Sequence, residues 1–433
     1  MNFEELRSQY SVFSYNGFTY SLVGSDLHIS FDFSIGEDIR FMPAMVLKAG
    51  RYAKYPEDLS SLEGIIFHIG LIELISYWKC TCSPILLIRP YKLTVEQQLW
   101  WRKLYWYGLG EFFYQNHIHT DHEHFLNFQF EDGASESVGL VYPHVAESDT
   151  TIVPIGGGKD SVVTLEELRV QRRVVPFIIN PRGATLACAE KAGFPTSDDI
   201  VVLKREISPA LLELNRQGFL NGHTPFSAML AFYTLLISAV TGIRDVALSN
   251  ESSANEPTIP GTYINHQYSK TLEFEEDFRY YVDTYMNACN HYYSYLRPLT
   301  ELQIAERFAR YPQYFQVFKS CNAGSKEDKW CCHCPKCLFA YIILSPFIDD
   351  ATMIEIFGED MLDNAELAPC LEQLAGLTTI KPFDCVGTVH EVNEALRRIS
   401  ESRKDKKLIK HYINKLLEQW NDNMLEDYIN MAP

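Results

Sequence analysis

The sequence predicts an α/β protein with a doubly wound parallel sheet at its centre, an N-terminal α+β domain and a helical C-terminal region. Between residues 151 and 249, short apolar runs of strand type alternate with amphipathic runs of helix type. Such alternation is typical of a parallel sheet that is covered on both faces. Residues 346–433 have mostly helical periodicity. We therefore expect domains at 1–145, 146–345 and 346–433.

Composition narrows the class of protein. The 433 residues are 46% hydrophobic and 13% aromatic, which favours a globular chain of two or three domains. No apolar run reaches the roughly 18 to 20 residues of a membrane span, and the charged N-terminus lacks a signal-peptide core. Eleven cysteines without a secretory signal favour the reducing cytoplasm. A net charge of −18 disfavours a nucleic-acid partner.

The N-terminal domain begins with a hairpin. Residues 18–22 and 27–33 alternate in polarity around a Gly-Ser-Asp turn. Residues 85–88 have the composition of a buried strand, and helices are expected at 65–78 and 95–115. The second helix is rich in aromatic residues, which favours a core or a domain interface over a ligand site.

Four histidines follow that helix in the stretch HIHTDHEH. They are His117, His119, His122 and His124. Four histidines this close together could bind a metal, but histidines in a polar loop after a helix are also common without a metal ligand. We expect a surface loop.

In the central region the elements alternate along the chain. Strands are expected at 151–155, 174–180, 199–203 and 246–249, and helices at 159–170, 184–192, 225–241, 301–310 and 338–344. Ligands of such sheets bind at the carboxyl ends of the strands. Asn180 and Arg182 follow one strand, and Asn250 and Glu251 follow another. These polar clusters are site candidates, with ordinary polar loops as the alternative.

A glycine loop joins the first central strand to its helix. Gly156, Gly157 and Gly158 turn the chain, and Lys159 and the two residues after it open the helix. Glycines let the backbone approach an anion closely, and the helix end supplies unpaired N–H groups and partial positive charge. The loop is neither GxxxxGK[ST] nor GxGxxG. The sequence predicts a phosphate site, with an ordinary glycine turn as the alternative.

This loop resembles the SGGxDS pyrophosphatase loop of the ATP-pyrophosphatase (PP-loop) superfamily, with Gly156 in place of the first serine. The resemblance implies a Rossmann-like PP-loop domain over 146–345, with ATP and Mg²⁺ as cofactors. It also implies cleavage of ATP between the α and β phosphates. Lys159 would neutralise phosphate, Ser161 would donate a hydrogen bond, and Asp160 would hold Mg²⁺ or orient the loop.

A dense polar stretch follows between residues 261 and 270. It contains Asn265, His266, Gln267 and Lys270 without amphipathic spacing. A potential base, a cation and several hydrogen-bonding groups within ten residues are more typical of a binding loop than of a core.

A cysteine cluster lies between residues 321 and 337. Cys331, Cys334 and Cys337 repeat at two-residue intervals, and Cys321 can supply a fourth sulfur. Tetrahedral Zn²⁺ favours such thiolate ligands. Cys332 or His333 could replace one of the four. The alternative is a cluster of free thiols at the start of a helix.

Taken together, these motifs are similar to those of the ATP-dependent UDP-N-acetyl-α-muramoyl-L-alanyl-L-glutamate epimerases (MurL type) of bacterial peptidoglycan synthesis. The similarity spans about residues 100–390. The stretches that carry it are Tyr107–Phe112, Ile155–Ser161, Leu214–Gly218, Asn221–His223, Ser249–Glu251, Asn265–Gln267, Ser269–Lys270, Arg297–Leu299, Ser320–Asn322, Trp330–Cys331, Cys334–Cys337, Lys381–Phe383 and Cys385–Gly387. The extra Cys332 is where this chain departs from the pattern.

The resemblance implies that the terminal L-glutamate of UDP-MurNAc-L-Ala-L-Glu is activated by ATP as an acyl-adenylate, releasing pyrophosphate, and is then inverted and hydrolysed to the D-glutamyl product and AMP. Inversion needs one mobile base or two facing bases. Candidate bases are His266, Lys270 and Glu251, which the sequence does not rank. Further candidates are Asn180 and Asn250 for the nucleotide, and Arg182, Arg216, His223, Asn265 and Gln267 for the substrate.

Two other functions fit the glycine loop. Another PP-loop enzyme, such as one similar to 7-cyano-7-deazaguanine synthase or a tRNA thiolase, would share the loop. The spacing of Cys321, Cys331, Cys334 and Cys337 resembles the zinc site of the former. The acidic charge disfavours the thiolase. A nucleotide-binding module without catalysis is the third reading, against which the intact Lys159, Asp160 and Ser161 argue.

Overall fold

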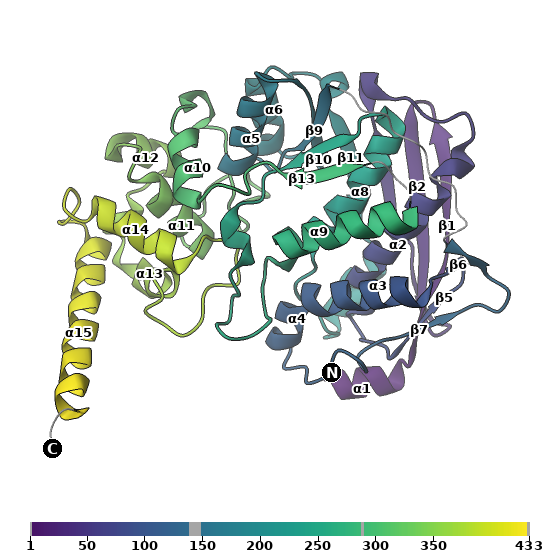
Figure 1. Ribbon diagram of the computed structural model, residues 1–433, viewed down its shortest axis with the longest axis horizontal. Coiled ribbons are helices and arrows are strands. Elements are labelled where there is room, and N and C mark those ends of the chain that lie inside the picture. Colours follow the sequence, from purple (N-terminus) through teal and green to yellow (C-terminus); the bar gives the residue numbers. More distant parts are fainter. Residues whose placement is uncertain (1, 138–148, 287–289, 431–433) are drawn as a thin grey trace.

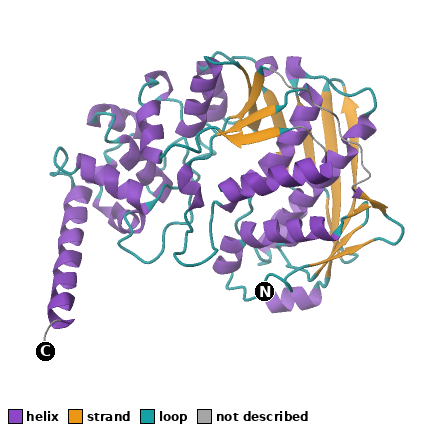
Figure 2. Cartoon of the chain, viewed as in Figure 1, coloured by secondary structure: helices purple, strands orange, loops and turns teal. Residues whose placement is uncertain are grey.

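The computed structural model describes residues 2–137, 149–286 and 290–430 (Figures 1 and 2). An 11-stranded sheet with helices packed against it fills one side of this part of the chain, and the C-terminal helices gather at the other side (Figures 1 and 2). Its strands are β1 (Val12–Val23), β2 (Asp26–Ile35), β3 (Ile39–Phe41), β4 (Ala44–Lys48), β5 (Ile85–Ile88), β7 (Asn127–Phe130), β9 (Thr150–Pro154), β10 (Arg173–Ile179), β11 (Val201–Glu206), β12 (Asp245–Leu248) and β13 (His291–Ser294). The short strands β6 (Tyr91–Lys92) and β8 (Ser135–Glu136) pair separately.

Helices connect and flank these strands. They are α1 (Phe3–Gln9), α2 (Glu63–Trp78), α3 (Val95–Gly108), α4 (Gly110–Gln115), α5 (Lys159–Arg169), α6 (Gly183–Lys191), α7 (Pro209–Arg216), α8 (Phe226–Thr241), α9 (Leu272–Tyr281), α10 (Glu301–Phe308), α11 (Pro335–Leu344), α12 (Asp350–Phe357), α13 (Ala368–Leu374), α14 (Val389–Ile399) and α15 (Lys407–Asn430). The expected helical character of the C-terminal region is confirmed within the described residues, and α15 projects away from the other helices (Figure 1).

The predicted parallel sheet is confirmed for β9 to β13. These strands lie side by side in the order β13-β12-β9-β10-β11, and each neighbouring pair is parallel. The chain starts this sheet at β9, adds β10 and β11 on one side, and then adds β12 and β13 on the other. In open α/β sheets, ligands bind at the carboxyl ends of the strands, where the order changes direction. That point lies at the carboxyl ends of the neighbouring strands β9 and β12.

The sheet continues into the N-terminal part of the chain. β4 lies antiparallel between β11 and β2, and β1, β5 and β7 complete the path. The predicted hairpin is confirmed as β1 and β2. The expected domain boundary between residues 145 and 146 lies outside the described residues. On its two sides, Phe13 and Phe177 belong to one hydrophobic core, so the two regions share a sheet and a core.

The helix expected at 95–115 is two helices, because the chain turns at Leu109. This residue ends α3 and begins α4 with φ −103° and ψ 9°. Gly108 and Gly110 flank it, and glycine lowers helix propensity on both sides. A Cβ atom at position 108 would lie 2.9 Å from the Pro225 ring, so this close approach requires glycine.

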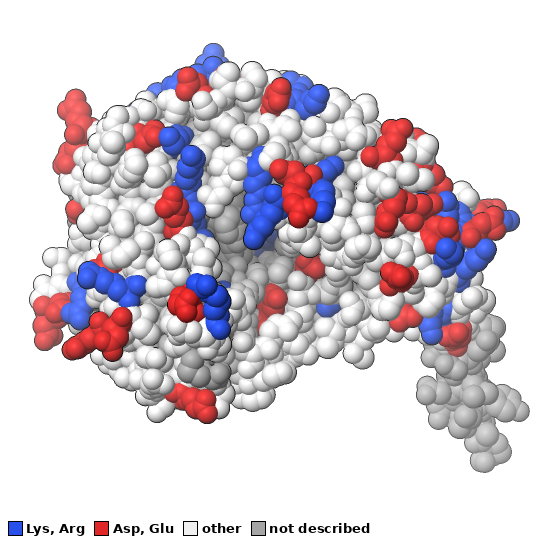
Figure 3. Space-filling view, turned by 180° about the vertical axis from the view of Figure 1, so that it is seen from behind, with Lys and Arg blue, Asp and Glu red and all other residues white. Residues whose placement is uncertain are grey.

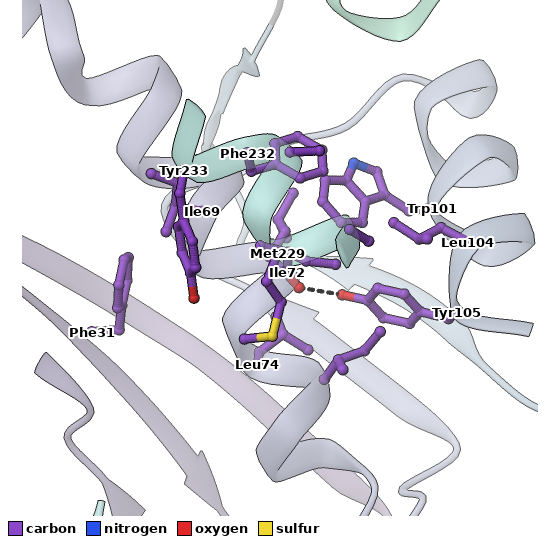
Figure 4. Packing of buried hydrophobic residues seen from close by; sticks show 14 of the residues in the cluster. Phe31, Ile69, Ile72, Leu74, Trp101, Leu104, Tyr105, Met229, Phe232 and Tyr233 are labelled. Atoms are coloured by element: carbon purple, nitrogen blue, oxygen red, sulfur yellow. Dashed lines mark hydrogen bonds between the residues drawn. The ribbon is translucent and has the colours of Figure 1, made fainter. Parts of the chain in front are cut away.

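Helices cover both faces of the central sheet. Ile152 and Val246 point into one hydrophobic core and Val153 and Ala247 into the other, because successive strand residues face opposite sides. Side chains of α2, α3 and α8 fill the first core, where Trp101 packs on Phe232 and the Tyr105 hydroxyl donates to the Leu71 carbonyl at 2.6 Å (Figure 4). Side chains of α5, α10, α11 and α14 fill the second core.

One helical stretch among the described residues, Leu59–Trp78, is long and apolar enough to cross a membrane by length and composition. In the structure, 78% of the most apolar 18 residues of this stretch is buried inside the protein. The stretch contains α2, which packs against α8 and β1. Packing in the core therefore accounts for its apolar composition.

Candidate functional site

A cavity of about 340 Å³ opens where β9 and β12 end. The glycine loop after β9, the Ser249–Glu251 turn after β12 and the start of α6 form one part of its wall. Helix α10 and the segment from Phe318 to Asp328 form another. Ten predicted site residues line it: Gly156, Gly158, Lys159, Asp160, Ser161, Arg182, Asn250, Glu251, Lys270 and Cys321.

The glycine loop packs closely against the start of α6. Gly157 has φ +82°, a left-handed conformation, and a Cβ atom there would lie 3.3 Å from the backbone of Ala184. Its carbonyl accepts from the Lys319 N–H at 2.8 Å. Gly158 begins α5 and offers no side-chain cap, so the first N–H groups of the helix have no such partner. An anion in the cavity can satisfy these donors.

Lys159 is buried beside two carboxylates. Its ammonium contacts Asp160 at 2.5 Å and pairs with Glu301 at the start of α10. Burial opposes the charged form, but the two carboxylates raise the pKa of Lys159 above its ordinary value, so the lysine is charged. Burial raises the pKa of Glu301. The Ser161 hydroxyl donates to the Gly158 carbonyl at 3.0 Å and steadies the loop.

Cations are more frequent at this cavity than in the whole chain. Five Lys and Arg residues line it against four Asp and Glu residues, whereas the chain has 38 against 56. Figure 3 shows a hollow in the rear face, with Lys and Arg side chains along its border and Asp and Glu side chains beside them. The cavity cations are Lys159, Arg182, Lys270, Lys319 and Lys336. Such a wall suits a polyanion of the size of a nucleotide phosphate chain.

A second cluster of titratable groups surrounds Cys385 in the cavity wall. The Lys270 ammonium and the His266 imidazole both interact with its sulfur. The Nδ1 atom of His266 pairs with Glu111, which also lies 3.3 Å from His223 Nδ1. Burial alone would raise the pKa of Cys385, but Lys270 and His266 lower it to about 6. Cys385 lines the cavity. His266 is not among the lining residues, and it acts on the cavity through its contact with Cys385.

The predicted cysteine cluster converges in space. The Sγ atoms of Cys321, Cys331, Cys334 and Cys337 all lie within 4.8 Å of one another. Three of the separations are 4.0 Å (321–334), 3.8 Å (331–337) and 3.4 Å (334–337). The Cys332 thiol instead donates to the Phe357 carbonyl at 3.2 Å.

Several predicted substrate residues have other partners. Arg216 is exposed on α7 and pairs with Glu213 at 2.6 Å, outside the residues that line the cavity. Asn265 donates to the Ala254 carbonyl at 2.9 Å and accepts from the Gln267 N–H, so it holds its own loop. The Gln267 side chain donates to the Val386 carbonyl at 3.3 Å and accepts from Lys270.

Asn180 also serves the backbone. It has φ +46°, and its side chain accepts from the Arg205 N–H at 2.8 Å and donates to the Arg205 carbonyl at 3.2 Å. It lines a neighbouring cavity that shares Arg182 with the main one. The Asn250 side chain donates to Ser294 at 3.1 Å and lies in the main wall.

The histidine-rich stretch is a surface loop, as expected. His117, His119 and His124 are exposed, and His122 packs edge-on against Trp106.

Sequence reasoning missed several wall residues. Glu301, Lys319, Lys336 and Cys385 line the cavity but were not singled out as site residues. Glu301 follows Thr300, whose side chain caps α10, and it reads as an ordinary first-turn acid. Cys385 offered a usable signal, because it stands in one of the stretches that resemble the MurL family.

Comparisons with known proteins agree with these features. The MurL N-terminal domain model matches residues 4–295, and the MurL C-terminal domain model matches residues 317–427. A UDP-N-acetyl-alpha-D-muramoyl-L-alanyl-L-glutamate epimerase of Xanthomonas oryzae pv. oryzae is 34% identical over 83% of this chain and 80% of its own length. Enzymes of the same name from Salinispora tropica and a Micromonospora species are 33% and 32% identical over 89% of this chain, and over 81% and 83% of their own lengths. The chain therefore belongs to the MurL epimerase family, and it is an isomerase.

Proposed function

We propose that this enzyme inverts the terminal L-glutamate of UDP-MurNAc-L-Ala-L-Glu through an acyl-adenylate, with ATP consumed to AMP and pyrophosphate. The observation that carries the proposal is the glycine loop at the head of α5, which opens into a cavity with five Lys and Arg residues in its wall, at the carboxyl ends of β9 and β12. A cavity with this placement and charge suits a nucleotide triphosphate. The names of the relatives supply the substrate.

Adenylation makes the α-proton acidic. A free carboxylate beside Cα carries negative charge that opposes a carbanion, whereas its mixed anhydride with AMP withdraws electrons. In this scheme the loop N–H groups and Lys159 hold the departing pyrophosphate, and Asp160 would help to hold Mg²⁺, which supplies further neutralisation of phosphate charge. Glu301 and Asp160 keep Lys159 charged until phosphate arrives.

The test is product analysis with the full chain, ATP, Mg²⁺ and UDP-MurNAc-L-Ala-L-Glu. We expect one AMP and one pyrophosphate for each D-glutamyl product, measured by chromatography and by chiral analysis after hydrolysis. UDP-MurNAc-L-Ala, which lacks the glutamate, is the matched control and should release no pyrophosphate. D-glutamyl product without ATP, or inversion without pyrophosphate, would contradict the proposal.

We also propose that Cys321, Cys331, Cys334 and Cys337 hold a structural Zn²⁺. Zn–S bonds of about 2.3 Å in a tetrahedron separate the sulfurs by about 3.8 Å, close to the three separations in this cluster. The Gly324 N–H donates to Cys321 Sγ at 3.1 Å, a contact that orients a sulfur ligand. The ion would fix the segment between the cysteines, part of which lines the cavity.

We expect purified protein to contain about one zinc per chain and Cys334→Ser to lose it, because three thiolates bind zinc far more weakly than four. Cys332→Ser is the matched control and should keep the metal, since its sulfur faces the Phe357 carbonyl. Elemental analysis by mass spectrometry measures both. Equal zinc content in the two variants would refute the assignment.

A further inference from the structure

Cys385 and the charged groups around it have no role in the adenylation step described above. Its thiol lines the cavity, on a segment more than 200 residues away in sequence from the glycine loop. Lys270 lines the same cavity, and its ammonium and the His266 ring both interact with the sulfur. Cys385 lies between helices α13 and α14 in sequence, in the C-terminal region. Because its side chain lines the cavity, this region contributes directly to the cavity wall.

The contacts form a chain of polar groups that ends at the sulfur. Glu111 on α4 accepts from His266 Nδ1, which fixes the ring, and His266 hydrogen-bonds Cys385. A base or nucleophile whose partner is oriented by a third group is the usual arrangement of an activated side chain. His266 is half-buried, and burial opposes its charge, yet Cys385 and Glu111 raise its pKa to about 9.

These groups favour the thiolate. Burial would raise the pKa of Cys385, but the Lys270 charge and the His266 hydrogen bond lower it to about 6. Between about pH 6 and pH 9 the cysteine is therefore a thiolate and His266 an imidazolium. The best catalytic acids and bases have pKa values close to the working pH.

We propose that Cys385, as a thiolate, accepts the Cα proton of the activated glutamyl residue, with Lys270 beside it to stabilise the enolate. The inference rests on the proposed function, because only an adenylated glutamyl group has a sufficiently acidic α-proton. A proton acceptor and a cation side by side are the two groups that enolisation needs. Two of the bases considered from the sequence therefore take other roles in this proposal. Lys270 stabilises the enolate oxygen, and His266 positions Cys385.

The step balances without a further reactant. The Cα–H bond breaks, the S–H bond of Cys385 forms, and the electron pair of the C–H bond moves into the acyl group as an enolate. Its negative charge falls on the former carbonyl oxygen, which Lys270 neutralises. Nothing is oxidised or reduced, and AMP remains attached until hydrolysis.

The test separates adenylation from proton transfer. In D₂O with ATP, Mg²⁺ and UDP-MurNAc-L-Ala-L-Glu, we expect Cys385→Ser to lose deuterium entry at glutamate Cα by at least about 100-fold, the scale of general acid–base catalysis. Exchange of labelled pyrophosphate into ATP, which needs only adenylation, should persist in this variant and shows that it is folded. Cys370→Ser, a half-buried cysteine on α13 that lies outside the residues lining the cavity, is the matched control for both measurements.

The outcomes are distinct. Wild-type protein without substrate-dependent pyrophosphate exchange would refute the proposed function itself. Wild-type exchange together with normal deuterium entry in Cys385→Ser would refute the role of Cys385 alone. A substrate acyl group found on Cys385 by intact mass analysis would also overturn it, because the cysteine would then be a nucleophile and not the proton acceptor.

A second readout needs no substrate. Mass spectrometry of the Cys385 peptide gives its rate of alkylation by iodoacetamide at each pH, and we expect this rate to reach half its maximum near pH 6. The charged groups that face the sulfur are Lys270, His266 and Lys336. Lys270→Met should move the midpoint upward, because it removes one of these cations. A wild-type midpoint near the ordinary thiol value of about 8.5 would overturn the proposal.

Discussion

Replacing Lys159 with methionine is expected to lower substrate-dependent pyrophosphate release by at least about 100-fold, the effect of losing one charged or polar donor to a transition state. Lys159 is the buried cation at the first turn of α5, where the glycine loop opens into the cavity. Its charge would stabilise the negative charge that develops on the departing phosphates. Pyrophosphate release and labelled pyrophosphate exchange, each measured at saturating ATP, check the result.

The fold should survive this change. Without Lys159, the buried Glu301 can take up a proton, since burial already raises its pKa. Lys204→Met, at an exposed position on β11, is the matched control and should release pyrophosphate at the wild-type rate. Circular dichroism should give the same spectrum for both variants. Pyrophosphate release by Lys159→Met within a few-fold of wild type would show that the loop does not hold the phosphates.

The central sheet could be predicted because its signals are local. A strand such as β9 is a short apolar run, and its neighbours β10 and β12 are short apolar runs that end in polar turns. The continuation through β4 into β2 and β1 could not be predicted. The antiparallel pairing of β4 with β11 joins residues more than 150 positions apart, and no local pattern encodes such a contact.

The same distinction between local and long-range signals applies to the residues of the candidate site. The glycine loop and the cysteine cluster are short motifs, so their residues were found together. Cys385 stands in a stretch that resembles the family, but its chemical role depends on Lys270 and His266, which are more than 100 residues away in sequence. Conversely, Arg216 was a candidate because of its charge and its neighbours in sequence, and it lies exposed on α7. A side chain acquires a chemical role from its surroundings, which the fold supplies.

The largest effect on stability is expected from Glu73→Ala. Glu73 lies fully buried on α2, and Arg205 of β11 donates two hydrogen bonds to it, from Nε at 2.7 Å and from Nη2 at 2.8 Å. The Tyr233 hydroxyl of α8 donates to the same carboxylate. Removing one partner of a buried ion pair costs about 3–5 kcal/mol, because the other charge stays buried without compensation. The free energy of unfolding, from the urea midpoint, should fall by that amount.

Two comparisons test this explanation. Glu131→Ala removes an ion pair with Arg89 in which both side chains are more than 40% exposed, and it should cost about 1 kcal/mol or less. Joint replacement of Glu73 by leucine and Arg205 by methionine removes both charges, so it should recover much of the loss of Glu73→Ala. If the double variant were as unstable as Glu73→Ala, the uncompensated Arg205 charge would not be the cause. Because this ion pair joins α2 to β11, its loss should loosen the contact between the N-terminal half of the sheet and the strands that carry the cavity.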